Sequence, residues 1–197
     1  MKRILLTVFT LFVVFANYAQ IPLGFKAGIN SNKIASRNVP FDYSYSLKSA
    51  ISFHVGVFTK LKLSNKLNFI PELRFIQKCG KPNSPNSNFT MKLSYIEFPL
   101  LISYQPLAWL SIEAGPSVGF NIGDNTNNDS YNLTDAGGIG GFRFNLTPKW
   151  SIITHYYYGM SPIGKFYFNS GPNSVLPAEE VKIYNQNIQL SVAYYLK

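Results

Sequence analysis

Hydrophobic and polar residues alternate one by one along most of this chain. In the segment 110–122, Leu110 and Ile112 fall on one face, whereas Ser111 and Glu113 fall on the other. A period of two residues is typical of a β-strand whose two faces meet different surroundings. Eight segments show this pattern: 23–30, 51–61, 67–78, 95–104, 110–122, 142–146, 150–159 and 187–196. The pattern therefore predicts an all-β fold of eight strands.

The length of these segments indicates where the strands lie. Most run for about 10 to 13 residues, which is what a tilted strand needs to cross the hydrocarbon layer of a membrane. Strands of soluble globular proteins average about 5 or 6 residues. Within a bilayer, strands satisfy their backbone hydrogen bonds only by closing into a barrel. We therefore expect a transmembrane β-barrel.

Connections of two sizes follow one another along the chain. Three are tight, at 64–66, 105–107 and 147–149, and four are long, at 31–49, 80–91, 124–135 and 160–182. Short periplasmic turns and long outer loops are the layout of an antiparallel up-and-down barrel of the bacterial outer membrane. Pro71, Pro99 and Pro116 lie inside predicted strands, where each removes a ladder donor, so we expect local disturbance of register there.

The N-terminal residues read as a sorting signal. Lys2 and Arg3 precede the apolar run 4–16, and Ala19 provides a small residue at a cleavage site. This order is that of a secretory signal peptide, and the apolar run is short for a membrane-spanning helix. We assign residues 1–19 to the signal peptide and 20–197 to the barrel domain. A retained anchor helix is the alternative.

Composition and charge agree with an envelope protein. Charged residues make up 14% of the chain and aromatic residues 16%, against about 25% charged in soluble domains. Without Lys2 and Arg3 the formal charge falls from +9 to +7. An exported basic chain suits anionic envelope components better than nucleic acid. We expect the protein to be a monomer in contact with membrane lipid. Lipopolysaccharide and other envelope proteins are further candidate partners. The predicted loop 31–49 contains Lys33, Arg37 and Lys48 and is a candidate contact with polysaccharide or lipid head groups.

Which face of the strands points inward is a separate question. In a soluble lipocalin-like barrel the apolar face would line a ligand cavity, whereas in a membrane barrel it meets lipid. The polar face is small and glycine-rich around Gly115, Ser117 and Gly119, which is unlike a surface exposed to water. Aromatic residues also gather near strand ends, as in interfacial girdles: Tyr104, Trp109, Trp150 and Tyr194. We therefore predict that the apolar face meets lipid, with the soluble barrel as the alternative.

Charged residues of both signs occupy the predicted inner face. An eight-stranded barrel has an interior that side chains fill, so buried carboxylates there need hydrogen-bonded partners. We predict a lumen charge network in which the carboxylates of Glu72, Glu97 and Glu113 pair with Arg74, Arg143 and Lys60. The alternative is that these charges are solvated at strand ends.

Catalytic and metal-binding patterns are weak. His54, His155 and Ser161 are the candidates for a lipid-modifying enzyme, but their spacing does not give a convincing catalytic set. Two histidines and the single Cys79 do not make a persuasive metal site, and glycines 137–141 open no helix that could bind phosphate. We predict no catalytic residue, no cofactor and no metal, with a lipid-modifying enzyme as the alternative.

Several motifs resemble a known family. The segments Tyr95–Leu101 (YIEFPLL), Ala114–Gly119 (AGPSVG), 135–144 and Tyr157–Gly159 are similar, in order and spacing, to those of the Bacteroidetes outer-membrane β-barrel family called PorT-like. The resemblance spans the predicted barrel domain. It implies an eight-stranded barrel in the cell outer membrane, with a secretion- or envelope-related role. Such barrels commonly end in an aromatic residue, whereas this chain ends in Lys197, with Tyr195 nearby.

Overall fold

The computed structural model describes residues 22–37, 48–81, 90–125, 132–168 and 179–196. The predicted signal peptide, residues 1–19, lies outside them. The described strands are β1 (Leu23–Arg37), β2 (Lys48–Thr59), β3 (Leu61–Lys62), β4 (Leu67–Lys81), β5 (Met91–Leu107), β6 (Leu110–Asp124), β7 (Thr134–Asn145), β8 (Trp150–Gly159), β9 (Gly164–Phe168) and β10 (Glu179–Tyr195). The described part of the chain contains no helix that is long and apolar enough to span a membrane.

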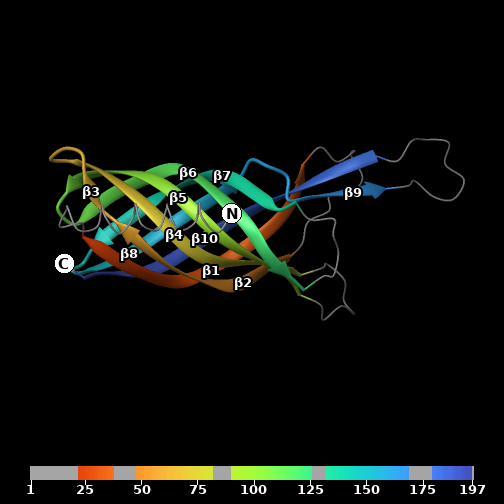
Figure 1. The fold of residues 1–197 in the computed structure, drawn as a ribbon, viewed down its shortest axis with the longest axis horizontal. Coiled ribbons are helices and arrows are strands. Elements are labelled where there is room, and N and C mark those ends of the chain that lie inside the picture. The colour runs from red at the N-terminus through yellow and green to blue at the C-terminus, as the bar shows by residue number, and fades with distance from the viewer. Residues whose placement is uncertain (1–21, 38–47, 82–89, 126–131, 169–178, 197) are drawn as a thin grey trace, which may run out of the picture.

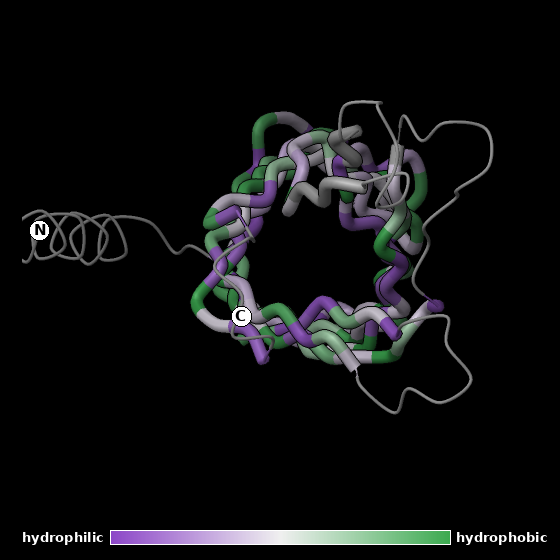
Figure 2. Tube along the Cα trace, turned by 90° about the vertical axis from the view of Figure 1, so that its right-hand side faces the viewer, coloured by the Kyte–Doolittle hydropathy of each residue, from purple (hydrophilic) through white to green (hydrophobic). Residues whose placement is uncertain are grey.

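Eight of these strands form a closed antiparallel barrel, which confirms the predicted fold. Neighbours in sequence pair in the order β1-β2-β4-β5-β6-β7-β8-β10, and β10 returns to pair with β1 from Gly24↔Tyr195 to Arg37↔Lys182. Viewed along its axis, the wall forms a ring in which hydrophobic and hydrophilic residues alternate along each strand (Figure 2). The two remaining strands are additions: β3 pairs with the start of β4, and β9 pairs with the start of β10.

The strands extend further on the long-loop side than the sequence predicts. Residues 31–37, expected in a loop, continue β1 because they pair with β10 through Ser36↔Ile183 and Arg37↔Lys182. The expected loop 160–182 contains β9 and the start of β10, which project beyond the other strands (Figure 1). Strand β7 starts at Thr134, eight residues before the predicted segment. The alternating pattern does not predict these parts. A strand beyond the hydrocarbon layer, or one rich in glycine, has no row of apolar residues that alternates with polar ones.

The prolines inside the strands leave the register intact, contrary to the expected disturbance. Pro71 pairs opposite Leu100, and three residues further along the same pair of strands Arg74 lies opposite Glu97 in the same register. Pro99 pairs opposite Ser117 without a shift toward Ile102↔Ala114. Proline removes one donor but changes no residue count between strands, so the alternation of faces continues through it.

The apolar face points outward around the barrel. Exposed rows run along most barrel strands, including Phe98, Leu100 and Ile102 on β5 and Ile188, Leu190 and Val192 on β10, whereas the glycine-rich β7 exposes only Phe142 among its large apolar residues. The aromatic residues predicted for the girdle lie at the short-turn end, where the rings of Trp150 and Tyr194 lie 4.7 Å apart. The soluble lipocalin-like alternative is therefore wrong, because it requires these rows to line the cavity.

The outward rows give a first testable prediction. Leu100 lies in the middle of β5 and is 45% exposed on the outer wall. Replacing it with Arg places a cation in the hydrocarbon layer, so Leu100→Arg is expected to lower the free energy of unfolding by about 2–4 kcal/mol. Urea unfolding of the mature chain in phospholipid vesicles measures this change.

Asn65→Arg is the matched control, because Asn65 lies in a short connection at the end of the barrel. It adds the same charge outside the hydrocarbon layer and is expected to leave stability nearly unchanged. Equal stability of the two variants would mean that Leu100 does not face lipid.

Candidate functional site: a charge network in the barrel lumen

The inward positions of the barrel strands carry charged and amide side chains. Most of these residues alternate with outward apolar neighbours, so the local strand geometry directs them into the lumen. Four cations and four carboxylates are buried there among the described residues: Lys26, Arg74, Lys78, Arg143, Glu72, Glu97, Glu113 and Asp135. Their formal charges cancel, which is the condition for burying so many ions in a narrow barrel.

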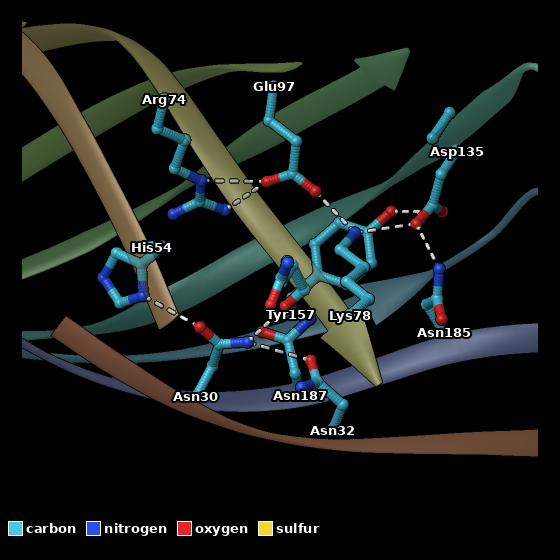
Figure 3. Close-up of polar contacts among 12 residues, drawn as sticks. Asn30, Asn32, His54, Arg74, Lys78, Glu97, Asp135, Tyr157, Asn185 and Asn187 are labelled. Atoms are coloured by element: carbon cyan, nitrogen blue, oxygen red, sulfur yellow. Dashed lines mark hydrogen bonds and ion pairs between the residues drawn. The ribbon is translucent and has the colours of Figure 1, made fainter. Parts of the chain in front are cut away.

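Arg74 and Glu97 form the centre of this network (Figure 3). They lie directly opposite one another on β4 and β5. Arg74 donates from Nε and Nη2 to Glu97 Oε2, at 2.9 and 2.6 Å, and from Nη1 to Gln189 Oε1 at 2.8 Å. A guanidinium that donates two hydrogen bonds to one carboxylate forms a strong, charge-assisted contact. This pair therefore joins β4 and β5 to β10 across the lumen.

Lys78 extends the network toward the long-loop end. Its Nζ lies 2.5 Å from Glu97 Oε1 and 2.7 Å from Asp135 Oδ2, so one ammonium bridges two carboxylates. Asp135 also accepts hydrogen bonds from the Tyr157 hydroxyl at 2.6 Å and from Asn185 Nδ2 at 2.7 Å. Lys78 Nζ lies 3.9 Å from the centre of the Tyr157 ring, a cation–π contact. These contacts join β4, β5, β7, β8 and β10.

The second centre is built on Glu113 and Arg143. Arg143 Nε donates to Glu113 Oε1 at 2.5 Å, and Nη1 donates to the Tyr195 hydroxyl at 3.2 Å. His155 Nε2 donates to the other carboxylate oxygen at 2.9 Å. The Arg143 guanidinium also lies 4.9 Å from the centre of the Phe58 ring. Glu113 is thus held by two donors from β7 and β8.

Lys26 completes the charge balance. Its Nζ lies 2.5 Å from Glu72 Oε2, and Arg74 Nη1 lies 3.9 Å from the same oxygen. Next to this group, His54 is held by amides and hydroxyls: Nδ1 donates to Asn30 Oδ1 at 3.0 Å, and Nε2 lies 2.7 Å from Ser191 Oγ. The inner surface of β1, β2 and β10 is therefore polar as well as charged.

Five of the six predicted network residues meet in the lumen, and Lys60 does not. Lys60 lies between β2 and β3 at the short-turn mouth, where Nζ donates to Gln105 Oε1 at 3.2 Å. No carboxylate of the described residues forms an ion pair with it. Arg143 and Glu113 are near enough to act on Lys60 electrostatically, but the hydrogen bond of its Nζ goes to Gln105. The structure therefore places Lys60 at the mouth of the barrel, beside the network.

Sequence reasoning missed Lys26, Lys78 and Asp135. A signal existed for the two lysines, since both lie on the polar face of alternating segments. Asp135 begins a glycine-rich strand, in which no alternation of apolar side chains assigns a face. The sequence also does not reveal which residue each of these charges pairs with. Alternation fixes the face of a residue but leaves the register between neighbouring strands open.

Glycines make room for the large inward side chains. Gly56 lies opposite Arg74, Gly119 opposite Glu97, and Gly141 opposite His155. A Cβ added at Gly56 would lie 2.5 Å from Arg74 Cβ, and one at Gly119 would lie 2.9 Å from Glu97 Cγ. The glycine-rich inner face noticed in the sequence is therefore the complement of the charge network.

Two clusters of buried apolar residues lie in the lumen with these charges. One contains Ile34, Ile76, Met91, Leu93, Tyr95, Ile163 and Ile183. The other contains Phe58, Ile70, Leu101, Ile139, Ile153, Tyr157, Ala193 and Tyr195. The first includes residues from the long-loop ends of β1, β5 and β10, and the second includes Phe58 and Tyr195 from the short-turn end. Apolar groups beside the ion pairs exclude water and strengthen the electrostatic contacts.

A shallow recess of about 530 Å³ opens at the short-turn mouth. Lys60, Gln105, Trp109, Asn145 and Tyr195 are among the residues that line it. Burial and the nearby Arg143 guanidinium lower the pKa of Lys60. Tyr195, which lines the recess, also accepts the hydrogen bond from Arg143 and so connects the recess with the charge network.

The candidate catalytic residues lie in different surroundings. His155 is 2% exposed and bonds to Glu113 inside the lumen, whereas Ser161 Oγ accepts from the backbone N–H of Ala136 at 2.6 Å. His54 bonds to Asn30, on the other side of the network. Cys79 is buried, and no group of three potential metal ligands occurs within the described ranges.

The Glu113–Arg143 contact generates the second prediction. Arg143→Met leaves Glu113 buried with one partner fewer, and such a loss is expected to lower the free energy of unfolding by about 3–5 kcal/mol. The double variant Arg143→Met/Glu113→Gln removes both charges and is expected to recover part of this loss. The melting temperatures of both variants are measured by heating the protein in detergent and monitoring the loss of the folded barrel from its mobility shift on gels. An unchanged melting temperature for Arg143→Met would contradict the network.

The glycine complement generates the third prediction. Gly56→Val forces a branched side chain against Arg74 and is expected to destabilise the barrel by about 1–3 kcal/mol through overpacking. Gly123→Val is the control, because a Cβ at Gly123 meets nothing within 4 Å. The same thermal measurement compares the two. Equal melting temperatures would mean that the lumen accommodates the added volume.

Comparisons with known proteins agree with this geometry. Residues 15–165 match the family model described as outer membrane protein beta-barrel domain. Similar solved structures include Ail of Yersinia pestis (13% identity, 90% of this chain and 100% of that chain, TM-score 0.51). They also include neisserial surface protein A (16%, 87% and 96%, 0.52) and OprG of Pseudomonas aeruginosa (10%, 89% and 96%, 0.50). No curated protein matches the sequence at a significant level. The chain belongs to the outer membrane protein β-barrel domain family and is located in the outer membrane.

Proposed function

We propose that this protein is a sealed, non-enzymatic barrel that acts by interaction at its outer end. The observation that carries the proposal is the filled lumen, in which a neutral set of ion pairs lies with two apolar clusters. An eight-stranded barrel is just wide enough for side chains to fill, and here large charged groups such as Arg143 are 0% exposed. Such an interior favours a membrane-anchored scaffold over a channel.

The outer end is the part of the barrel best suited to recognition. Strand β9 and the start of β10 form a ribbon that extends past the other strands on the long-loop side (Figure 1). Loops and extensions carried on a rigid scaffold are where binding functions concentrate. We propose membrane lipid, lipopolysaccharide and other envelope proteins as partners of a monomer.

A lipid-modifying enzyme is the second candidate. Its supporting observation is the His155–Glu113 hydrogen bond at 2.9 Å, since a carboxylate that orients a histidine is common in hydrolases. The burial of His155 in the lumen counts against access by lipid. His155→Ala would abolish lipid modification if this candidate were correct.

We further propose that the chain is one of the PorT-like barrels of Bacteroidetes, with a secretion- or envelope-related role. Two motifs that carry the resemblance, Tyr95–Leu101 on β5 and Ala114–Gly119 on β6, face one another in the sheet. A Cβ at Gly115 would overlap the carbonyl oxygen of Leu100, so the glycine of one motif fits the backbone of the other. This mutual fit supports treating the two motifs as one feature of a family.

Two measurements test the scaffold proposal, and they form the fourth prediction. In planar lipid bilayers the purified mature chain is expected to give no stepwise conductance. In cells that lack the native gene, a variant in which residues 166–180 are replaced by a short Gly-Ser turn is expected to insert normally but fail to restore the wild-type envelope phenotype.

The control for the second measurement is a matched replacement of 64–66 by Gly-Ser at the opposite end, which is expected to restore the phenotype. Stable conductance steps would overturn the sealed barrel. Full complementation by the 166–180 replacement would overturn an interaction role for the ribbon.

A further inference from the structure

Four exposed lysines gather on one side of the outer end of the barrel. They are Lys33, Lys48, Lys81 and Lys92, and they lie on β1, β2, β4 and β5, which are consecutive neighbours in the sheet. We call this group the outer lysine face. None of the four forms an ion pair with a carboxylate of the described residues. All of them lie at the long-loop ends of their strands.

The outer lysine face begins just where the apolar rows end. On β1 the outward row ends at Ile29, and Ser31 separates it from Lys33; on β5, Ser94 likewise separates Ile96 from Lys92. Each two-residue step along a strand is roughly 6–7 Å, so each of these two lysines lies two steps, roughly 13 Å along the strand, beyond the last apolar residue of its row. Lysines at this distance from the hydrocarbon layer lie at the level of lipid head groups, where their stems cover apolar surface and their ammonium groups reach polar atoms.

Two of these lysines lie in direct opposition. The register places Lys48 of β2 opposite Lys81 of β4. Like charges directly opposite on neighbouring strands destabilise a sheet unless an anion lies between them. Below this pair the outer wall is apolar, with Ile51 76% exposed and the rings of Phe53 and Phe75 5.7 Å apart.

The outer ends of β6, β7 and β8 lack this arrangement. The outer ends of β6, β7 and β8 present Asp124 and Thr134, and Met160 directly follows β8. Asp124 bounds the lysine face on the β6 side. The exposed cations are thus concentrated on the side of β1, β2, β4 and β5, and Lys182 of β10, opposite Arg37 of β1, continues this side beyond the four lysines.

We propose that the outer lysine face binds the phosphate groups of an anionic lipid of the outer leaflet, while the apolar rows beneath it contact the acyl chains. A lipid phosphate satisfies both observations, since it relieves the Lys48–Lys81 repulsion and lies beside an apolar wall. The inference rests on the proposed function for the outward orientation of the long loops, and it adds a ligand class and a site.

The double variant Lys48→Gln/Lys81→Gln tests the site in the purified mature barrel in neutral detergent, as the fifth prediction. The probe is lipid A with two phosphates, compared with dephosphorylated lipid A and with inorganic phosphate. Lipid A is expected to bind the parent protein, measured by native mass spectrometry, and the other two are not. Each lysine near a charged membrane surface contributes about fivefold to binding, so the double variant is expected to bind roughly 25-fold more weakly.

The matched control is Lys62→Gln/Lys66→Gln, which removes the same charge from exposed positions at the short-turn end. It is expected to bind lipid A like the parent. An equal loss in the control, or equal binding of dephosphorylated lipid A, would overturn the proposal. Equal binding of inorganic phosphate would do the same, because the site would then not select a lipid.

Stability without lipid provides a second readout. The double variant is expected to melt at or above the temperature of the parent, because it removes a like-charge pair. A lower melting temperature would mean that the lysines serve contacts within the protein, which overturns the proposal. If the double variant does not fold, Lys48→Gln alone is expected to fold and to bind about fivefold more weakly. The variant with residues 166–180 replaced is expected to fail to restore the envelope phenotype. If it still binds lipid A normally, the lipid site and the function of the ribbon are independent of one another.

Discussion

Closure of the sheet between β1 and β10 is the constraint on which this structure depends. With Gly24 opposite Tyr195 and Arg37 opposite Lys182, the outermost strands satisfy one another's backbone groups, and the barrel has no open edge in the hydrocarbon layer. Closure also divides the side chains into two sets. Each residue of a barrel strand faces either lipid or the lumen, and with eight strands the lumen is narrow enough that its side chains must fill it.

The side chains fill the lumen because each buried charge lies beside an opposite charge and large side chains lie opposite glycines. Four cations and four carboxylates neutralise one another, and Lys78 and Glu113 each contact two partners. A large side chain such as Arg74 lies opposite a glycine on the next strand. Because the contacts run between strands that are distant in sequence, the network ties the wall together across its interior and does not rely on the backbone ladder alone.

The sealed interior that we propose leaves the two ends and the outer wall for interactions of the protein. The two ends differ in charge and in shape. The long-loop end has the β9–β10 ribbon and the outer lysine face, while the short-turn end has a shallow recess beside Lys60 and exposed tryptophans. The five acidic residues that lie outside the lumen occur in or next to the long connections, so the short-turn end is basic throughout. The anionic lipid that we propose as a ligand of the outer lysine face fits the local excess of exposed cations among the described residues there.

The sequence by itself determined the class of fold, the number of barrel strands, the face of the side chains in the alternating segments and five of the six proposed lumen charges. All of these follow from local alternation, which is a property of single strands. Only the tertiary structure decided which charges meet, that Lys60 lies outside the network while Lys26, Lys78 and Asp135 lie within it, and that β9 extends the wall. Those features depend on the register between strands and on pairing beyond the hydrocarbon layer, where an alternating pattern carries no information.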